Sequence, residues 1–588
     1  MTSVQTVQSP SSAAETTKGE RSGKLRDRAG TIGLRLPLAG WMLLLVLAPL
    51  GLLLIYSFWQ SDNGLTVRHW NLDNYRSVVA SKTYRVLLWR TLYTAVCSAL
   101  LATSVAFPMA YFVSRRLRRH KLTAVLLIII PLWVSLLLRI FAWKVILGEN
   151  GFLNSALMDA GIIHQPSTAF LYTRFTVFLT LTYIAIPFVF ITSYTAIERV
   201  PHSLIEASQD SGANGWRTFT NVVWPLTKQS VAIGFSLALL IAVGDYVTPQ
   251  LVGGLDGTML GSVIASQFGL VGNWPLGAAM SCVLLVAVFA LLAIVVRAAR
   301  VRGVLDSEAD SGTPPRTWRG TGLGSRVRTG AAWVLFVCPY VVLYLPLFVI
   351  VLFSFNNSTA QSLPLAGFTL SWYKSVWSDS GIMEALRQTI EVGVGVVAVG
   401  AIAGTYFALV FSRARSRGAA LSQAILTLPV LLPGVVLGLA LAITFQVGGI
   451  QPGTTAIILG HATFVVPVMM LIIVARLRRL DPSLAQASMD CGAGHIRTFW
   501  YVIFPEIRSA LIGAALLGFT LSFDEVIVTF FLVGPTPTLP VYIWNQVRFG
   551  FTPEVNAVFT IIGLISLTAI LAAGRILRSD LFGRRQPA

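Results

Sequence analysis

Long apolar stretches recur along this chain of 588 residues, and each is long enough to cross a membrane as a helix. A hydrocarbon core about 30 Å thick needs roughly 20 apolar residues in helical form. Helix is the expected spanning element, because the stretches lack the alternation of barrel strands and a helix satisfies its own backbone in lipid. The pattern predicts twelve spans, at residues 37–59, 88–113, 122–147, 175–197, 228–251, 276–299, 331–355, 387–412, 420–446, 454–475, 509–533 and 556–577.

Composition supports an all-α integral membrane protein. The chain is 55% hydrophobic and 12% charged, whereas a soluble domain has roughly 25% charged residues. The net charge is +19, and most of the 44 Lys and Arg residues fall in segments that share one side when the N-terminus is cytoplasmic. This asymmetry follows the positive-inside rule, so we expect both termini in the cytoplasm and no nucleic-acid partner.

The two halves of the chain repeat each other. The polar stretch "EASQDSGANGWRTFTNVVWP" (206–225) returns as "QASMDCGAGHIRTFWYVIFP" (486–505), 280 positions later. Pro187 and Pro467 have the same separation, and Tyr75 in "HWNLDNYRSVV" matches Tyr373 in "FTLSWYKSVW". Six spans in each half, both beginning on the same side, predict two parallel six-helix bundles with a pathway between them.

The same pattern predicts the domain organisation. The stretch between the sixth and seventh spans is rich in Gly, Pro, Ser and Arg and has too little apolar content to fold. We therefore expect a disordered cytoplasmic tail at 1–30, a first six-helix domain at 31–302, a cytoplasmic linker at 303–329 and a second six-helix domain at 330–588.

Each repeated polar stretch is expected to form an elbow of two short helices. Gly212 and Gly492 permit a turn between them, and Pro225 and Pro505 mark the start of the following span. One interpretation is that each elbow packs only against its own bundle. Two copies in equivalent loops favour a docking role instead, with a partner that is also present in two copies.

The repeated stretch resembles a known family motif. This motif is typical of the membrane permeases of ABC importers that use a soluble binding protein. It consists of Glu-Ala-Ala, three further residues, Gly, nine further residues and hydrophobic-x-x-Pro. Gln486 replaces the acidic residue in the second copy. The resemblance implies the type I ABC importer permease fold, with both elbows as coupling helices that contact an ABC ATPase dimer. The expected coupling residues are Glu206, Ala207, Ser208, Asp210, Gly212, Arg217, Gln486, Ala487, Ser488, Asp490, Gly492 and Arg497.

A narrower resemblance concerns the substrate. "IAVGDYVTPQLVGG" (241–254) and "PLWVSLLLRIFAW" (131–143) resemble one permease of the spermidine/putrescine importers, and "SFDEVIVTFFLVG" (522–534) and "GHATFVVP" (460–467) resemble its partner permease. The chain is thus similar to a fusion of both. The resemblance implies polyamine import across a bacterial plasma membrane, with an extracytoplasmic solute-binding protein as partner. The same branch includes permeases for ferric iron, opines and phosphonates, which stay open as alternatives.

Other chemistry has little support in the sequence. The chain has no Gly-x-x-x-x-Gly-Lys-Ser/Thr loop, so we expect a transport subunit without catalytic residues that depends on a separate ATPase. Its four Cys and six His residues lack ligand spacing, so no metal or cofactor is expected. We expect His461 to bond within the bundle. The rival from another class is a twelve-helix secondary transporter driven by an ion gradient. A channel is a third and weaker candidate.

Three acidic residues in the fifth and eleventh spans are candidates for the substrate pathway. Ionisable groups at membrane depth usually face a pathway or a partner, and aromatic faces attract ammonium groups. An alternative is that the acids pair with Arg139 or Lys144, or form a gate for any substrate. The expected pathway residues are Asp245, Asp524, Glu525, Trp133, Arg139, Tyr183, Tyr246 and Phe523.

Overall fold

The computed structural model describes residues 36–117, 120–299, 323–359, 365–413, 416–549, 553–565 and 568. The expected tail at 1–30 and residues 303–322 of the expected linker lie outside them. In the described part, nine helices are long and apolar enough to cross a membrane, and two bent helix pairs raise the number to eleven. A shorter apolar helix, Glu554–Ile565, lies at the expected twelfth span. The all-α membrane fold is therefore confirmed.

The first half contains six spans and a small hairpin. Its helices are α2 (Leu36–Met42), η1 (Leu43–Leu47), α3 (Ala48–Tyr56), α4 (Asp73–Ala80), α5 (Lys82–Arg116), α6 (Lys121–Ile129), η2 (Ile130–Trp133), α7 (Leu136–Leu147), α8 (Phe152–Asp159), η3 (Thr168–Phe170), α9 (Arg174–Glu198), α10 (His202–Asp210), α11 (Gly215–Thr218), η4 (Phe219–Val223), α12 (Trp224–Gly244), α13 (Val247–Val252), α14 (Leu260–Gly269) and α15 (Trp274–Ala299).

The second half has the same succession of spans and a matching elbow. Its helices are α16 (Leu323–Ser354), α17 (Ser371–Ser378), α18 (Ser380–Val399), η5 (Gly400–Gly404), α19 (Thr405–Arg413), α20 (Arg417–Leu431), α21 (Gly434–Val447), α22 (Thr454–Leu477), α23 (Pro482–Asp490), α24 (His495–Thr498), η6 (Phe499–Ile503), α25 (Phe504–Phe523), α26 (Thr529–Leu532) and α27 (Leu539–Phe549).

The second, fourth and fifth spans form the core of each half. In the first half α5, α9 and α12 pack on one another, and in the second half α18, α22 and α25 do the same. Small side chains allow this close packing, since helices in lipid associate through van der Waals contact. Five alanines on α5 are almost fully buried at helical spacing: Ala95, Ala99, Ala102, Ala106 and Ala110.

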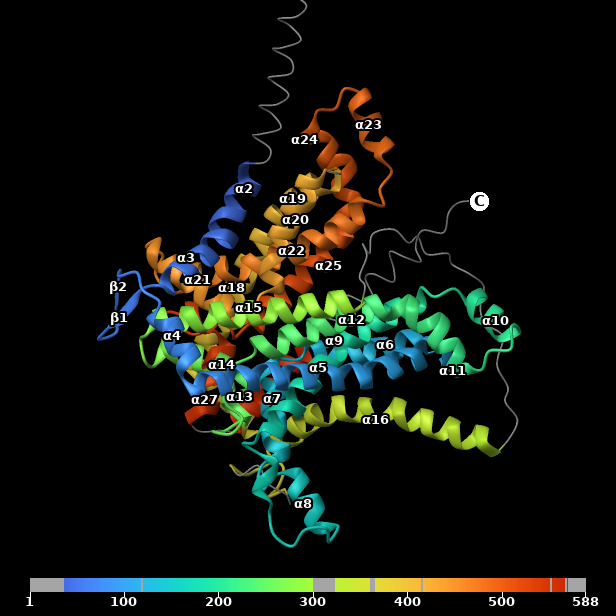
Figure 1. Cartoon of the computed structure of the whole chain (residues 1–588), viewed down its shortest axis with the longest axis vertical. Coiled ribbons are helices and arrows are strands. Elements are labelled where there is room, and N and C mark those ends of the chain that lie inside the picture. The colour runs from blue at the N-terminus through green and yellow to red at the C-terminus, as the bar shows by residue number, and fades with distance from the viewer. Residues whose placement is uncertain are drawn as a thin grey trace, which may run out of the picture.

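The first span of each half packs against the other half. Helix α3 contacts α21, and α16 lies along α5 and contacts α7 (Figure 1). Tyr340 and Tyr344 on α16 donate hydrogen bonds to the carbonyls of Ala124 and Leu127 on α6, at 3.0 and 2.8 Å. The two halves are therefore interlocked, so their boundary along the chain is not their boundary in space.

The segment after the first span shows the repeat in side-chain detail. Tyr75 and Ser57 form a hydroxyl–hydroxyl bond of 2.6 Å, and Tyr373 and Ser354 form the equivalent bond of 2.7 Å. Both serines are fully buried. The repetition predicted from the sequence thus extends to a buried hydrogen bond.

A short antiparallel hairpin follows the first span of the first half. Strands β1 (Gln60–Asp62) and β2 (Leu65–Val67) are joined at Asn63 and Gly64, whose φ values are 48° and 81°. Two successive residues with positive φ are typical of a tight hairpin turn, and Asn-Gly is its preferred sequence.

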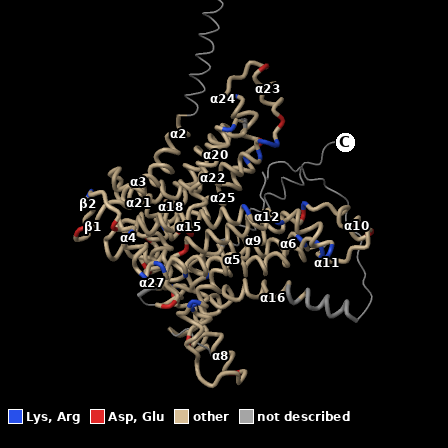
Figure 2. Tube along the Cα trace, viewed as in Figure 1, with Lys and Arg blue, Asp and Glu red and all other residues tan. Residues whose placement is uncertain are grey.

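The two elbows lie at separate extremities of the molecule. Helices α10 and α11 end one bundle, and α23 and α24 end the other (Figure 1). Lys, Arg, Asp and Glu gather near these ends, whereas the long helices between are mostly uncharged (Figure 2). We call the part of the molecule that carries these two ends the elbow side.

Candidate coupling surfaces and translocation site

The turn in each elbow depends on a glycine with positive φ. Gly212 has a φ of 80° and Gly492 a φ of 83°. The Gly212 N–H donates to the carbonyl of Gln209 at 2.9 Å, and the Gly492 N–H donates to the carbonyl of Met489 at the same distance. Glycine adopts this conformation without steric cost. The turn expected from the sequence is present at both positions.

A hydroxyl pair braces each elbow. Ser208 Oγ and Thr218 Oγ1 hydrogen-bond at 3.2 Å, and Ser488 Oγ and Thr498 Oγ1 hydrogen-bond at 3.1 Å. Both threonines are only 3% exposed. The bond links the short helix before the glycine to the one after it, which explains why these residue types repeat.

The elbow surface combines polar and apolar side chains. Leu204 and Leu484 are equivalent and 46% and 49% exposed, while Trp216 and Ile496 are equivalent and 71% and 76% exposed. The two elbows therefore present exposed apolar side chains at equivalent positions. The other exposed positions on the two elbows include Glu206, Ala207, Asp210, Gly212, Arg217, Gln486, Ala487, Asp490, Gly492 and Arg497.

The two elbows are anchored by different chemistry. Asp481 accepts a hydrogen bond of 2.9 Å from the backbone N–H of Ser483, and this bond holds the pKa of Asp481 below its usual range. The first elbow instead begins beside Arg115. Partial burial, then the Arg115 guanidinium and Lys121, lower the pKa of His202. The elbows therefore share a shape but differ in the charged groups at their starts.

Each elbow continues directly into the following span. Residues Gly215–Gly244 and His495–Phe523 form two long helices of 30 and 29 residues, each with a π-helical turn near its start. The sequence predicted a short amphipathic run followed by a separate span, so the continuity is an addition from the structure. A continuous helix therefore connects each elbow to the middle of the molecule.

The third and ninth spans are sharply bent. Helices α6 and α7 with their flanking turns meet at 88°, and α20 and α21 meet at 106°. Leu432 is extended because a following proline disfavours the α conformation, and Pro433 directly precedes α21. Ser135 is the corresponding residue before α7. The hydropathy pattern marked both regions as spans without indicating these bends.

The fifth and eleventh spans are also interrupted. After α12, Asp245 accepts hydrogen bonds from the backbone N–H of Thr248, at 2.9 Å, and from the Thr248 hydroxyl. After α25, Glu525 accepts from the backbone N–H of Val528 at 2.8 Å. Asp245 and Glu525 are equivalent positions, so a carboxylate at the same place in each half caps the helical turn after the break. The expected spans 228–251 and 509–533 are thus broken rather than continuous.

The breaks of one half meet those of the other. Asp524 Oδ2 accepts a hydrogen bond of 2.7 Å from the backbone N–H of Leu136, the first residue of α7. At the equivalent contact a Cβ added to Gly244 would lie 2.7 Å from the backbone nitrogen of Gly434. Gly244 and Asp524 are 280 positions apart. We call these four meeting breaks the constriction.

Three carboxylates and one guanidinium lie at the constriction. Arg139 is 5% exposed and interacts electrostatically with both Asp524 and Asp245. Glu525 is close enough to both aspartates for like-charge repulsion. Among the described residues no ion pair within 4 Å includes Arg139, and Asp524 Oδ1 is buried without a hydrogen-bond partner. The structure therefore brings together four of the predicted pathway residues.

The predicted aromatic residues are packed rather than exposed to open space. Tyr183 is 2% exposed and donates a hydrogen bond of 3.0 Å to the carbonyl of Leu343 on α16. Tyr246 is fully buried and its ring centroid lies 5.6 Å from that of Phe530. Phe523 packs on Phe519 at 5.6 Å. The backbone of Trp133 lies in η2, and its side chain is outside the described part.

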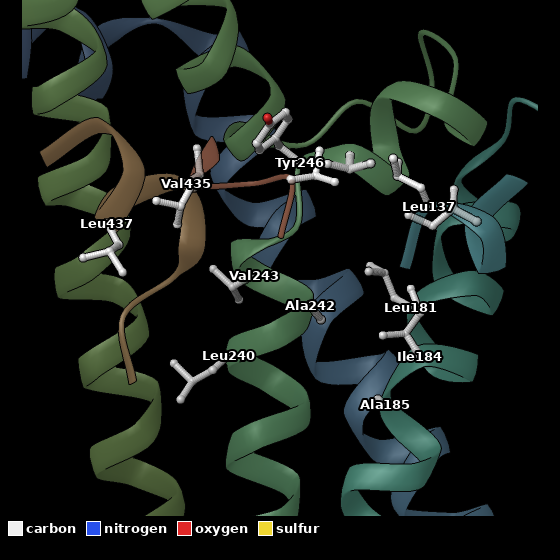
Figure 3. Close-up of a cluster of buried hydrophobic side chains, with 14 of the residues drawn as sticks. Leu137, Leu181, Ile184, Ala185, Leu240, Ala242, Val243, Tyr246, Val435 and Leu437 are labelled. Carbon is white, nitrogen blue, oxygen red and sulfur yellow. The ribbon is translucent and has the colours of Figure 1, made fainter. Parts of the chain in front are cut away.

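Apolar side chains close the space around the break in the fifth span. Figure 3 shows Leu240, Val243 and Tyr246 from the first half beside Val435 and Leu437 of α21. All five are at most 7% exposed. Around the fifth-span break the constriction is therefore closely packed, whereas Asp524 and Glu525 at the eleventh-span break are partly exposed.

Several residues of the constriction were absent from the sequence-based prediction. These are Leu136, Thr248, Gly434 and Gly244. Pro433 was a visible signal for the bend in the ninth span, since proline restricts the residue before it. The cross-half contacts had no local signal.

Two interlocked units with equivalent spans, elbows and breaks define a duplicated membrane permease. The family described as "Binding-protein-dependent transport system inner membrane component" matches residues 106–306 and 397–579. The chain belongs to this family. It is a multi-pass permease subunit of an ABC importer and not an enzyme, and permeases of this family work with an ATPase and a solute-binding protein. The ion-driven secondary transporter is thereby excluded.

Individual relatives each correspond to about half of the chain. "Spermidine/putrescine transport system permease protein PotB" of Haemophilus influenzae is 32% identical over 44% of this chain and 90% of the relative. "Putrescine transport system permease protein PotI" of Escherichia coli is 33% identical over 42% of this chain and 90% of the relative. A solved bacterial ABC transporter involved in the import of the acidic polysaccharide alginate covers 45% of this chain and 99% of its own, with 16% identity and a TM-score of 0.35. The two family matches and the two permease relatives are consistent with two permeases in one polypeptide.

Proposed function

We propose that this chain forms the complete substrate pathway of a polyamine importer in a bacterial inner membrane. The observation that carries the proposal is the constriction, where three carboxylates and one guanidinium meet between the halves. The names of the relatives, which include spermidine and putrescine permeases, support the same substrate class.

The charge balance at the constriction suits a polycation. The carboxylates of Asp245 and Glu525 each accept a backbone N–H of a local helical turn. They therefore contribute negative potential to the constriction rather than free hydrogen-bond acceptors. Asp524 differs, because Oδ2 accepts from the Leu136 N–H while Oδ1 lacks a partner of good hydrogen-bond geometry, although the Ser135 hydroxyl also lies beside this carboxylate. A substrate ammonium group donates three hydrogen bonds and would satisfy Oδ1. An anionic phosphonate would face net repulsion there.

The elbows are proposed to dock on an ABC ATPase dimer in the cytoplasm. Their matching apolar pairs support two equivalent contacts, and the continuous helices provide a link to the breaks at Asp245 and Asp524. Closure of the ATPase dimer would move both elbows and thereby the constriction. The opposite face is proposed to receive the substrate from an extracytoplasmic solute-binding protein.

Uptake by the reconstituted complex tests the substrate class. The chain, its ATPase and its binding protein are placed in liposomes, and uptake of labelled putrescine and spermidine is compared with uptake of a phosphonate, an opine and ferric iron. We expect ATP-dependent uptake of the polyamines alone. Uptake of one of the other three without polyamine uptake would overturn the polyamine proposal while leaving the family assignment intact.

Asp245 allows a second, sharper comparison. Asp245→Asn removes the charge and alters the cap, whereas Thr248→Val alters the cap and keeps the charge. If the charge of Asp245 attracts the substrate, Asp245→Asn lowers polyamine uptake more than Thr248→Val does. Equal losses would assign Asp245 to the cap alone.

A further inference from the structure

A single histidine bridges the two sides of the break in the eleventh span. His461 on α22 is fully buried, and both of its ring nitrogens are bonded. Nδ1 lies 2.8 Å from Ser522 Oγ, in the last turn of α25, and Nε2 lies 2.8 Å from Thr529 Oγ1, the first residue of α26. The expected bonding within the bundle is confirmed, and it spans the break.

The neighbouring bonds assign the direction of each proton. Thr529 donates its only hydroxyl proton to the carbonyl of Glu525, at 2.7 Å. Thr529 Oγ1 must then accept from His461, so Nε2 carries the ring proton and Nδ1 accepts from Ser522. A neutral imidazole satisfies every group in this series of hydrogen bonds. The series ends on a backbone carbonyl within the break, where the interrupted helix leaves carbonyls without intrahelical partners.

The break in the fifth span has no such bridge. Leu181, Ala242 and Pro249 occupy the positions equivalent to His461, Ser522 and Thr529. All three are buried and none has a side-chain hydrogen-bonding group. Figure 3 shows Leu181 and Ala242 among apolar side chains. The directional bonds at this break include the Asp245 cap and a bond of 3.3 Å from the Ser262 hydroxyl to the carbonyl of Tyr246, and apolar packing holds the three equivalent positions.

This difference bears on the contact between the halves. Ser522 lies two residues before Asp524, whose Oδ2 accepts from the backbone N–H of Leu136. Hydrogen bonds have a preferred direction and distance, whereas apolar contact is non-directional. We propose that His461 is a positioning residue that holds the eleventh-span break rigid and keeps Asp524 on α7, so that the fifth-span break is the mobile side. The inference rests on the proposed role of the constriction in transport.

Hydrogen–deuterium exchange of the intact complex, measured by mass spectrometry, tests the proposal. His461→Leu introduces the residue that the first half has at the equivalent position, Leu181. His461→Gln keeps one hydrogen-bond donor and one acceptor. Thr463→Val is the matched control, because Thr463 is equally buried on the same helix but bonds only the carbonyl of Leu459, at 2.9 Å. Ser522→Ala deletes one end of the bridge and leaves the histidine in place.

We expect exchange in residues 522–530 to be about tenfold faster in His461→Leu, which corresponds to about 1.4 kcal/mol. Ser522→Ala gives a smaller increase in the same segment, and His461→Gln restores most of the protection. Residues 242–250 stay unchanged in every variant. ATP hydrolysis without binding protein rises in His461→Leu and returns toward the wild-type rate in His461→Gln, which loss of packing alone would not produce.

Equal exchange in His461→Leu and Thr463→Val would overturn the proposal, as would faster exchange spread over the whole second half. Ser522→Ala decides the matter if His461→Leu does not assemble, since an unchanged 522–530 segment in that variant also overturns it. Exchange requires no substrate. A wrong substrate class would therefore appear in the uptake assay and leave the exchange result unaffected.

Discussion

The backbone N–H of Leu136 donates a hydrogen bond of 2.7 Å to Asp524 Oδ2, and this bond joins the third span of one half to the eleventh span of the other. The acceptor is a carboxylate at the N-terminus of α7, where unpaired N–H groups favour negative charge. At the equivalent position of the first half stands Gly244, which meets Gly434 by backbone contact alone. The two halves share an architecture, but their central contacts differ chemically.

The charge of Asp524 should matter more than its hydrogen bond. Asp524→Asn keeps an acceptor for Leu136 and removes the charge, so we expect correct assembly with about tenfold lower uptake of putrescine and spermidine. Assembly is checked by co-purification with the ATPase and uptake by labelled substrate in liposomes. Wild-type uptake by Asp524→Asn would remove Asp524 from the pathway.

Gly244 should not tolerate a side chain. The added Cβ of Gly244→Ala would lie 2.7 Å from the backbone nitrogen of Gly434 and 3.0 Å from Pro433 Cα, so the halves must separate at the constriction. We expect a lower melting temperature and loss of uptake. Gly513→Ala is the control, because nothing lies within 4 Å of its added Cβ and a helical Gly→Ala change stabilises by about 0.5–1 kcal/mol. The same melting temperature for both variants would contradict the close approach.

The elbow glycines should control coupling rather than folding. A Cβ at Gly212 or Gly492 meets no atom within 4 Å, but φ values of 80° and 83° impose strain of about 1–2 kcal/mol on valine. In the double Val variant we expect reduced ATPase co-purification and hydrolysis that no longer drives uptake. Gly494→Ala, with an ordinary φ of −70°, should behave as wild type. Full transport by the double variant would rule out the elbows as coupling surfaces.

The elbow side should be cytoplasmic. After replacement of Cys97, Cys282, Cys338 and Cys491, single cysteines are introduced at Ser203 on the first elbow and Ser378 at the end of α17, both exposed. A membrane-impermeant maleimide added to intact cells should label Ser378→Cys and leave Ser203→Cys unlabelled until the cells are opened. Labelling of Ser203→Cys in intact cells would reverse the proposed orientation.

Much of the fold was available from the sequence, because it depends on local properties. Hydropathy over windows of about 20 residues located the spans, since each helix satisfies its backbone without help from distant residues. The repeat located the elbows, and Gly212 and Gly492 indicated their turns because only glycine adopts positive φ freely. Asp245, Asp524 and Glu525 were conspicuous because charge is rare at membrane depth.

Tertiary structure decided how these parts meet. The crossing of α3 and α16 onto opposite halves, the capping roles of Asp245 and Glu525, and the separate role of Asp524 all depend on contacts between residues far apart in the chain. Leu136 and Asp524 are 388 positions apart, and Gly244 approaches Gly434 across the same interface. No local pattern encodes such contacts, because they arise only when two bundles pack and leave their interrupted helices facing each other.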